Sequence, residues 1–265
     1  MHSIFEVLSI FDESHDFMKI LVCISAVPDT TSKINFTADQ KSLDASGIQF
    51  VINPNDEFGL TRAVWFKEQQ GAEVHIATVG ETSVEAIMRK ALAIGADKAF
   101  RIDTHPTDGF LVAHALSEQI KKENYDLVVC GRESIDYNGN MVPGLIASHC
   151  GYSFINTCTG LTIDGNKATA TREIDGGSET LETSLPLVIG AQKGLVEESD
   201  LKIPNMRGIM SARTKPLEVI TPSNLEALTE DLSFEKPASK GEVTLIDEAN
   251  LDQLIELLHK EAKVL

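Results

Sequence analysis

The stretch Ala170–Gly190, ATREIDGGSETLETSLPLVIG, joins two kinds of β-strand pattern in one short run. Charged residues from Arg172 to position 175 end a first strand, and Gly176-Gly177 then favours a tight turn because glycine tolerates positive φ. Residues 180–183 alternate polar and apolar side chains, whereas Leu187–Ile189 is apolar throughout. The stretch therefore predicts an antiparallel hairpin with a polar tip, followed by a core strand.

Working outward, strand and helix patterns alternate along most of the chain. We expect strands at Lys19–Val27, Glu73–Val79, Lys98–Ile102, Tyr125–Gly131 and Pro186–Gly190. We expect helices at Asn53–Gln70 (with Asn53 as N-cap and Pro54 at the first position), Ser83–Ile94, Phe110–Glu123 and Gly139–Cys150. Such alternation predicts an α/β fold with a doubly wound, mostly parallel sheet, in the strand order 3-2-1-4-5.

The remaining segments suggest how the chain is organised. We expect residues 1–17 to be an N-terminal extension, 18–192 an α/β domain, 193–215 an irregular loop region, and 216–265 an acidic C-terminal arm with a helix over 247–260. An antiparallel hairpin, residues 156–184, interrupts the α/β domain. The apolar face of the last helix either clasps a partner or folds back on the sheet.

Composition excludes several classes of function. A net charge of −17 in 265 residues argues against nucleic-acid binding and against attraction to anionic lipids. No apolar run reaches the length of a membrane-spanning helix, and residues 1–17 lack the basic side chains of a signal or transit peptide. We expect a cytoplasmic bacterial protein without direct membrane insertion.

The four cysteines indicate neither a metal site nor a disulfide framework. Cys23 and Cys130 lie inside apolar strand patterns, and the spacing of His149, Cys150 and Cys158 matches no zinc module. We interpret all four as reduced, small core residues of an intracellular protein.

Topology indicates where a ligand would bind. In a doubly wound sheet the ligand crevice lies at the carboxyl ends of the strands where the strand order reverses, here between the first and fourth strands. The loops at that point are Ser25–Lys33 and Gly131–Gly144. The second is rich in glycine and asparagine and precedes a helix whose amides could bind phosphate, although it could also be an ordinary strand–helix connection. The chain has no G-x-G-x-x-G after the first strand, no P-loop and no catalytic constellation.

Six segments in the same order resemble the electron transfer flavoprotein β-subunit family. They are Ile20–Asp29, Asn53–Glu57, Ala91–Asp97, Gly131–Gly144, Arg172–Pro186 and Ile203–Met206. The resemblance runs from about Met18 to the C-terminus. It implies a non-enzymatic electron carrier that pairs with an α subunit, shares the FAD of that subunit, and takes electrons from dehydrogenases such as acyl-CoA dehydrogenases. It also implies AMP, or a second FAD, in the β subunit itself.

The family resemblance also implies site residues. The cofactor-binding residues would be Cys23, Asn53, Pro54, Asn55, Asp56, Val79, Gly131, Arg132, Glu133, Ser134, Ile135, Asp136, Tyr137, Asn138, Gly139, Asn140, Met141 and Val142. Glu173 would approach the flavin, and Ile203, Pro204 and Asn205 would bind partners, with Ile203 as an apolar anchor. Met141-Val142 replaces a Gln-Thr pair common in the family, so backbone amides would have to supply more of the phosphate contacts.

Two other functions stay open at this point. The chain could be a non-redox adenine-nucleotide sensor or hydrolase with a fold like that of universal stress proteins. It could also be an assembly partner with an empty pocket. Ile203 could, in addition, serve only local packing.

Overall fold

A computed structural model of the chain describes residues 17–223, 226–239, 241 and 243–265. Apart from Phe17, the predicted N-terminal extension, residues 1–17, lies outside these residues. The described chain divides into two units. The first comprises residues up to 33 together with 45–231, and the second comprises 34–44 together with 232–265.

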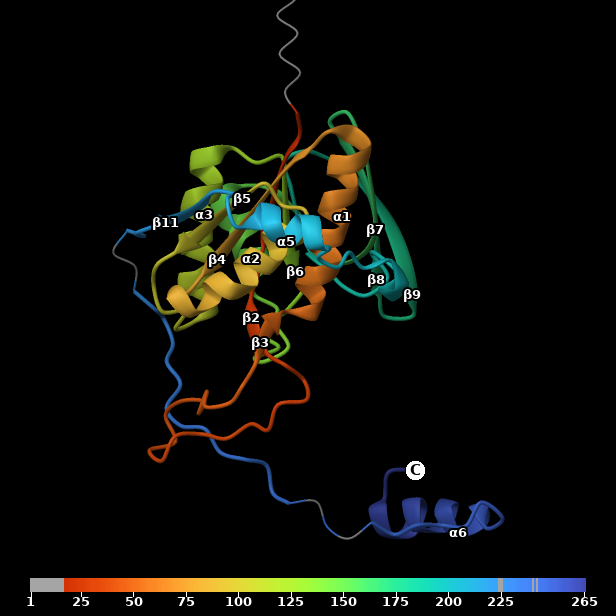
Figure 1. Cartoon of the computed structure of the whole chain (residues 1–265). Coiled ribbons are helices and arrows are strands. Elements are labelled where there is room, and N and C mark those ends of the chain that lie inside the picture. The colour runs from red at the N-terminus through yellow and green to blue at the C-terminus, as the bar shows by residue number, and fades with distance from the viewer. Residues whose placement is uncertain (1–16, 224–225, 240, 242) are drawn as a thin grey trace, which may run out of the picture. The chain divides into compact units, whose positions relative to one another are not determined.

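The first unit is built on one twisted sheet with helices on both faces (Figure 1). Within the described residues the sheet has the strand order β11-β5-β4-β1-β6-β10-β7-β8-β9. The strands are β1 (Lys19–Cys23), β4 (Glu73–Val79), β5 (Lys98–Ile102), β6 (Leu127–Gly131), β7 (Ser153–Asp164), β8 (Lys167–Ile174), β9 (Gly177–Ser184), β10 (Leu187–Ala191) and β11 (Leu217–Ile220). The helices of this unit are α1 (Pro54–Gln70), α2 (Glu85–Ile94), α3 (Gly109–Glu123), α4 (Val142–Cys150) and α5 (Met206–Ala212).

The predicted fold class and strand order are confirmed. The five expected strands are β1, β4, β5, β6 and β10, and β5-β4-β1-β6-β10 is the order 3-2-1-4-5. In this sheet all neighbouring strands from β11 to β7 are parallel, whereas the β7–β8 and β8–β9 pairs are antiparallel.

Three details differ from the sequence prediction. The inserted segment contributes three strands rather than two, and β7 pairs with β10, so the insertion extends the main sheet. A helix, α5, forms in the expected irregular region 193–215, and Leu217–Ile220 of the expected arm forms the edge strand β11. The first apolar run is broken after Cys23, and a short ribbon of β2 (Ala26–Pro28) and β3 (Phe50–Ile52) follows it.

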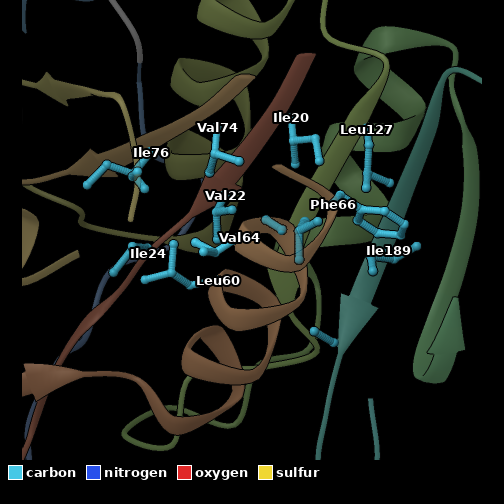
Figure 2. Packing of buried hydrophobic residues seen from close by; sticks show 14 of the residues in the cluster. Ile20, Val22, Ile24, Leu60, Val64, Phe66, Val74, Ile76, Leu127 and Ile189 are labelled. Carbon is cyan, nitrogen blue, oxygen red and sulfur yellow. The ribbon is translucent and has the colours of Figure 1, made fainter. Parts of the chain in front are cut away.

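Strict alternation along β1 builds the two cores. Ile20 and Val22 belong to the cluster beneath α1 and α2, whereas Leu21 and Cys23 belong to the cluster beneath α3 and α4. Figure 2 shows the first cluster, in which Leu60 of α1 packs among strand side chains. Burying one such leucine contributes about 1.5–3 kcal/mol.

Helix α1 packs directly on the central strand β6. At Gly59 an added Cβ would lie 2.5 Å from Cγ1 of Val129, so only glycine allows this close approach. The helix ends at Gly71, which has a φ of 74°. The contact between Gly59 and Val129 places the first turns of α1 against the carboxyl end of β6.

The second unit is small. The Phe36 and Phe234 rings stack with centroids 5.2 Å apart, and the Phe234 N–H donates to the carbonyl of Gln40. The expected C-terminal helix is present as α6 (Leu251–Glu256), which continues as π-helical turns to Ala262.

Candidate nucleotide site at the strand switch point

A single buried carboxylate connects the two strands at the switch point. Oδ2 of Asp56 accepts the N–H of Ser25 at 2.7 Å, just after β1, and Oδ1 accepts the N–H of Gly131 at 2.8 Å, at the end of β6. The residue is 2% exposed. Both oxygens are therefore engaged by the backbone, and Asp56 connects the ends of β1 and β6.

Burial raises the pKa of Asp56 to about 7, against the opposing effect of the hydrogen bonds from Ser25, Asn53 and Gly131. A buried carboxylate is costly, and backbone amides are the donors that reduce this cost. The start of α1 adds favourable dipoles. The site consequently has an ionisable group with a pKa near neutrality directly below its loops.

The two asparagines flanking Pro54 attach the second loop to α1. Asn53 occupies the N-cap position of α1, but its side chain makes no capping hydrogen bond. Instead its Nδ2 donates to the carbonyl of Glu133 at 2.9 Å, and its Oδ1 accepts the N–H of Ile135 at 3.2 Å. Nδ2 of Asn55 donates to the same carbonyl at 3.1 Å. The expected side-chain cap is thus wrong, because the loop uses that side chain.

Gly131 makes this close association possible. An added Cβ would lie 2.3 Å from Oδ1 of Asp56, 2.8 Å from Cβ of Asn55 and 2.9 Å from Nδ2 of Asn53. The backbone of β6 and the start of α1 therefore meet without an intervening side chain. The loop that follows Gly131 therefore begins at the carboxyl end of β6.

The outer part of the loop is exposed and ends at the start of α4. Tyr137 is 65% and Met141 is 50% exposed, and Asn138 and Asn140 have φ values of 51° and 48°. Met141 occupies the N-cap position of α4 but provides no side-chain acceptor, so the amides of Val142 and Gly144 in the first turn lack a side-chain cap. Such amides suit an anion such as phosphate.

Cys23 and Val79 lie at the ends of neighbouring strands, at the floor of the same edge. Both are buried, and both belong to the apolar cluster on the α3 and α4 face. A hydrogen bond with the Cys23 thiol, together with burial, raises the pKa of Cys130. All four cysteines are free; Cys23, Cys130 and Cys158 are buried as predicted, whereas Cys150 is only partly buried.

The predicted flavin-proximal residue, Glu173, lies further along the sheet, near the end of β8. Its Oε2 accepts a hydrogen bond from Nε2 of Gln192 at 2.6 Å, and its carbonyl accepts one from Oγ1 of Thr157 at 2.8 Å. Glu173 is exposed, whereas Gln192 is 8% exposed. Gln192 could not be identified from the sequence, because only the tertiary structure brings it to Glu173.

One of the predicted partner-binding residues, Ile203, lies on an exposed apolar surface around α5 that also includes Met206 and Met210. Ile203 is 82%, Met206 74% and Met210 67% exposed. Asn205 caps α5, since its side chain accepts the N–H of Gly208 at 2.8 Å. A groove of about 520 Å³ lies alongside, lined by Arg89, Lys90, Ala93, Pro204, Ile209, Ala212 and Arg213.

This surface is supported by α2. NH1 of Arg89 donates to the carbonyls of Ala212 and Lys215, each at 2.8 Å, and so closes the C-terminal end of α5. Nζ of Lys215 in turn donates to the carbonyl of Leu92 in α2 at 2.9 Å. Ile203 therefore stands next to a fixed helix.

Asp108, at the start of α3, connects that helix to a later segment of the chain, and this role was not predicted from the sequence. Its Oδ1 caps α3 by accepting the N–H of Leu111 at 2.7 Å, and its Oδ2 accepts the N–H groups of Leu228 and Thr229 at 2.7 and 2.8 Å. Burial opposes the charged form, but these hydrogen bonds hold the pKa of Asp108 below its ordinary value. An Asp-Gly before an amphipathic run indicates the cap, but not the contact with the later segment.

The part of the chain that the structure describes contains no helix long and apolar enough to cross a bilayer. It also contains no group of three His, Cys, Asp or Glu side chains suited to a metal ion.

Gly131→Ala tests the close contact between β6 and α1. We expect this substitution to lower the free energy of unfolding by about 1–3 kcal/mol, because the new methyl overlaps Asp56 and Asn55. Gly139→Ala in the same loop is the matched control, since nothing lies within 4 Å of its added Cβ. Urea unfolding of both variants measures the difference, and equal stabilities would contradict the proposed packing.

Asp56→Asn tests the buried carboxyl through pH. The folded pKa is about 7 and the unfolded pKa is 3.8, so the folded state retains the proton over this range. The stability contributed by Asp56 is complete below the lower value and is lost as pH rises to about 7. We expect the unfolding free energy of the wild type, relative to Asp56→Asn, to fall across this window and to level off above it. A difference that is independent of pH would refute the assignment.

Comparison with known proteins agrees with the resemblance found in the sequence. The family profile described as "Electron transfer flavoprotein domain" matches residues 41–225. A protein named electron transfer flavoprotein subunit beta from Syntrophomonas wolfei is 36% identical over 226 residues, which cover 84% of this chain and 88% of the relative.

Other relatives with the same name come from distant organisms. The Bacillus subtilis protein is 32% identical over 262 residues, covering 94% of this chain and 100% of the relative. The Homo sapiens protein is 32% identical over 223 residues, covering 82% of this chain and 86% of the relative. The chain therefore belongs to the electron transfer flavoprotein β-subunit family.

Proposed function

We propose that this chain is the β subunit of a heterodimeric electron carrier, with an adenine nucleotide bound where β1 and β6 end. The observation that supports this most strongly is the attachment of the loop after β6 to the start of α1 by Asn53, Asn55 and Asp56. That attachment fixes a loop and a helix start at the position where doubly wound sheets bind nucleotides.

The residues present fit such a ligand. The uncapped amides at the start of α4 can receive a phosphate group without help from Met141. Cys23 and Val79 offer an apolar floor for an adenine ring. The proposed ligand contacts come from the predicted set between Gly131 and Val142, whereas Asp56 acts by positioning the loops. AMP and a second FAD both satisfy this description.

The redox cofactor is proposed to be an FAD held mainly by an α subunit. Bound FAD accepts and passes on one or two electrons, and the β subunit contributes orientation and electrostatics. Glu173 is the proposed flavin-proximal group. The surface around Ile203 is the proposed docking site for a dehydrogenase of the acyl-CoA class, because an exposed aliphatic side chain beside a rigid helix can insert into a partner pocket.

Co-expression with an α subunit tests the heterodimer. We expect the purified pair to show flavin absorbance and the chain expressed alone to show little, since the flavin is held mainly by the partner. Absence of a stable pair would contradict the proposal. Steady ATP hydrolysis by the isolated chain would instead favour a nucleotide hydrolase.

Ile203→Ala tests the docking surface. We expect electron transfer from an acyl-CoA dehydrogenase to slow by roughly fivefold or more, because truncating an interface anchor costs over about 1 kcal/mol. Flavin content and melting temperature should not change, since Ile203 is 82% exposed. Val219→Ala, at a 52% exposed position on β11, is the control, and equal transfer rates for the two variants would refute the anchor role.

A further inference from the structure

The side chain of Gln192 is a buried amide at the carboxyl end of β10. It follows Ala191, the last residue of that strand, and is 8% exposed. Its Nε2 donates to Oε2 of Glu173 at 2.6 Å. Glu173 belongs to β8, and β7 lies between β10 and β8 in the sheet. The hydrogen bond therefore spans an intervening strand.

An irregularity in β7 permits this contact. The register of β7 shifts against β10 between Ile189 and Ala191, and against β8 between Cys158 and Gly160. Thr157, at the irregularity, has a φ of 50°, which is uncommon for a β-branched residue. Its Oγ1 donates to the carbonyl of Glu173 at 2.8 Å. Strained residues of this kind persist where the surrounding structure requires them, often at functional sites.

The charge of Glu173 is not cancelled by a neighbouring cation. Arg172 pairs with Glu179, and Lys193 pairs with Glu198 at 2.8 Å. Among the residues that the structure describes, no ion pair includes Glu173, and Gln192 is the side chain that donates to its carboxylate. A neutral amide fixes the orientation of a carboxylate but leaves its full negative charge.

We propose that Gln192 is a positioning residue that holds the Glu173 carboxylate, still charged, toward the flavin of the partner subunit. This inference rests on the proposed function, in which Glu173 is flavin-proximal. A fixed negative charge disfavours the more negative, reduced states of a nearby flavin and so lowers its reduction potential. When the amide is removed, the carboxylate is free to turn into solvent, where its influence is screened.

The test is a redox titration of the assembled heterodimer. Glu173→Gln removes the charge, Gln192→Leu removes the donor, and the double variant removes both. We expect both single variants to raise the flavin midpoint potential. The expected rise corresponds to an increase of at least about threefold in the equilibrium constant for flavin reduction. We expect the double variant to equal Glu173→Gln, because Gln192 acts only through Glu173.

Two further variants separate positioning from general stability. Gln69→Leu makes the same chemical change at an exposed position of α1 and should leave the potential unchanged. Gln192→Asn keeps the amide but shortens its reach, so it should match Gln192→Leu even if the apolar variant is less stable. Flavin content and melting temperature are measured alongside.

The possible outcomes distinguish the positioning role of Gln192 from the proposed electron-carrier function. If Glu173→Gln shifts the potential and neither Gln192 variant does, or if the effects add in the double variant, the positioning role is overturned. If no variant shifts the potential while the heterodimer retains flavin, the role of Glu173 is wrong and the carrier function stands. If the wild-type chain forms no flavin-containing heterodimer, the proposed function itself fails.

Discussion

The carboxylate of Asp56 is the constraint on which the rest of this site depends. Two parallel strands, β1 and β6, end side by side, and their chains then leave in different directions. Asp56 binds one backbone amide from each, at Ser25 and Gly131, and belongs to the first turn of α1. One side chain thus connects a helix to the ends of two strands. The price is a buried acid whose pKa is raised to about 7.

The chain combines a rigid edge with exposed apolar surface elsewhere. Asp56, Asn53 and Asn55 attach the loop after β6 to the start of α1, and Arg89 attaches α5 to α2. Ile203, next to α5, is almost fully exposed. A monomer has no need for such exposure, whereas a carrier that meets successive partners requires a permanent docking surface that does not have to fold on contact.

Much of the architecture could be predicted from local pattern. The alternation of Ile20 and Val22 with Leu21 and Cys23 places a two-sided strand at the sheet centre, and Pro54 and Gly71 delimit α1. The pairing of β7 with β10 could not be predicted, because parallel neighbours are set by tertiary packing and leave no short-range signal. The edge strand β11 has only four residues, of which two are exposed and none is fully buried. Such a short, weakly buried segment has no pattern that identifies it as a strand.

The site shows the same division. The family resemblance, and not the topology, placed Asn53–Asp56 in one site with Gly131, and the structure shows that the two segments are in contact. The actual partners of these side chains were not predictable: Asn53 serves a loop instead of its own helix, and Asp56 binds two distant amides. Gln192 and Asp108 act through contacts with residues far away in the sequence, which one sequence cannot reveal.

The crevice between β1 and β6 is most directly tested by its contents. The heterodimer, purified without added nucleotide, can be denatured and the released compounds separated by chromatography. An adenine nucleotide beyond the FAD of the α subunit, either AMP or further FAD, is the predicted result. Release of the α-subunit FAD alone, from a heterodimer that is otherwise intact, would contradict a nucleotide site on this chain.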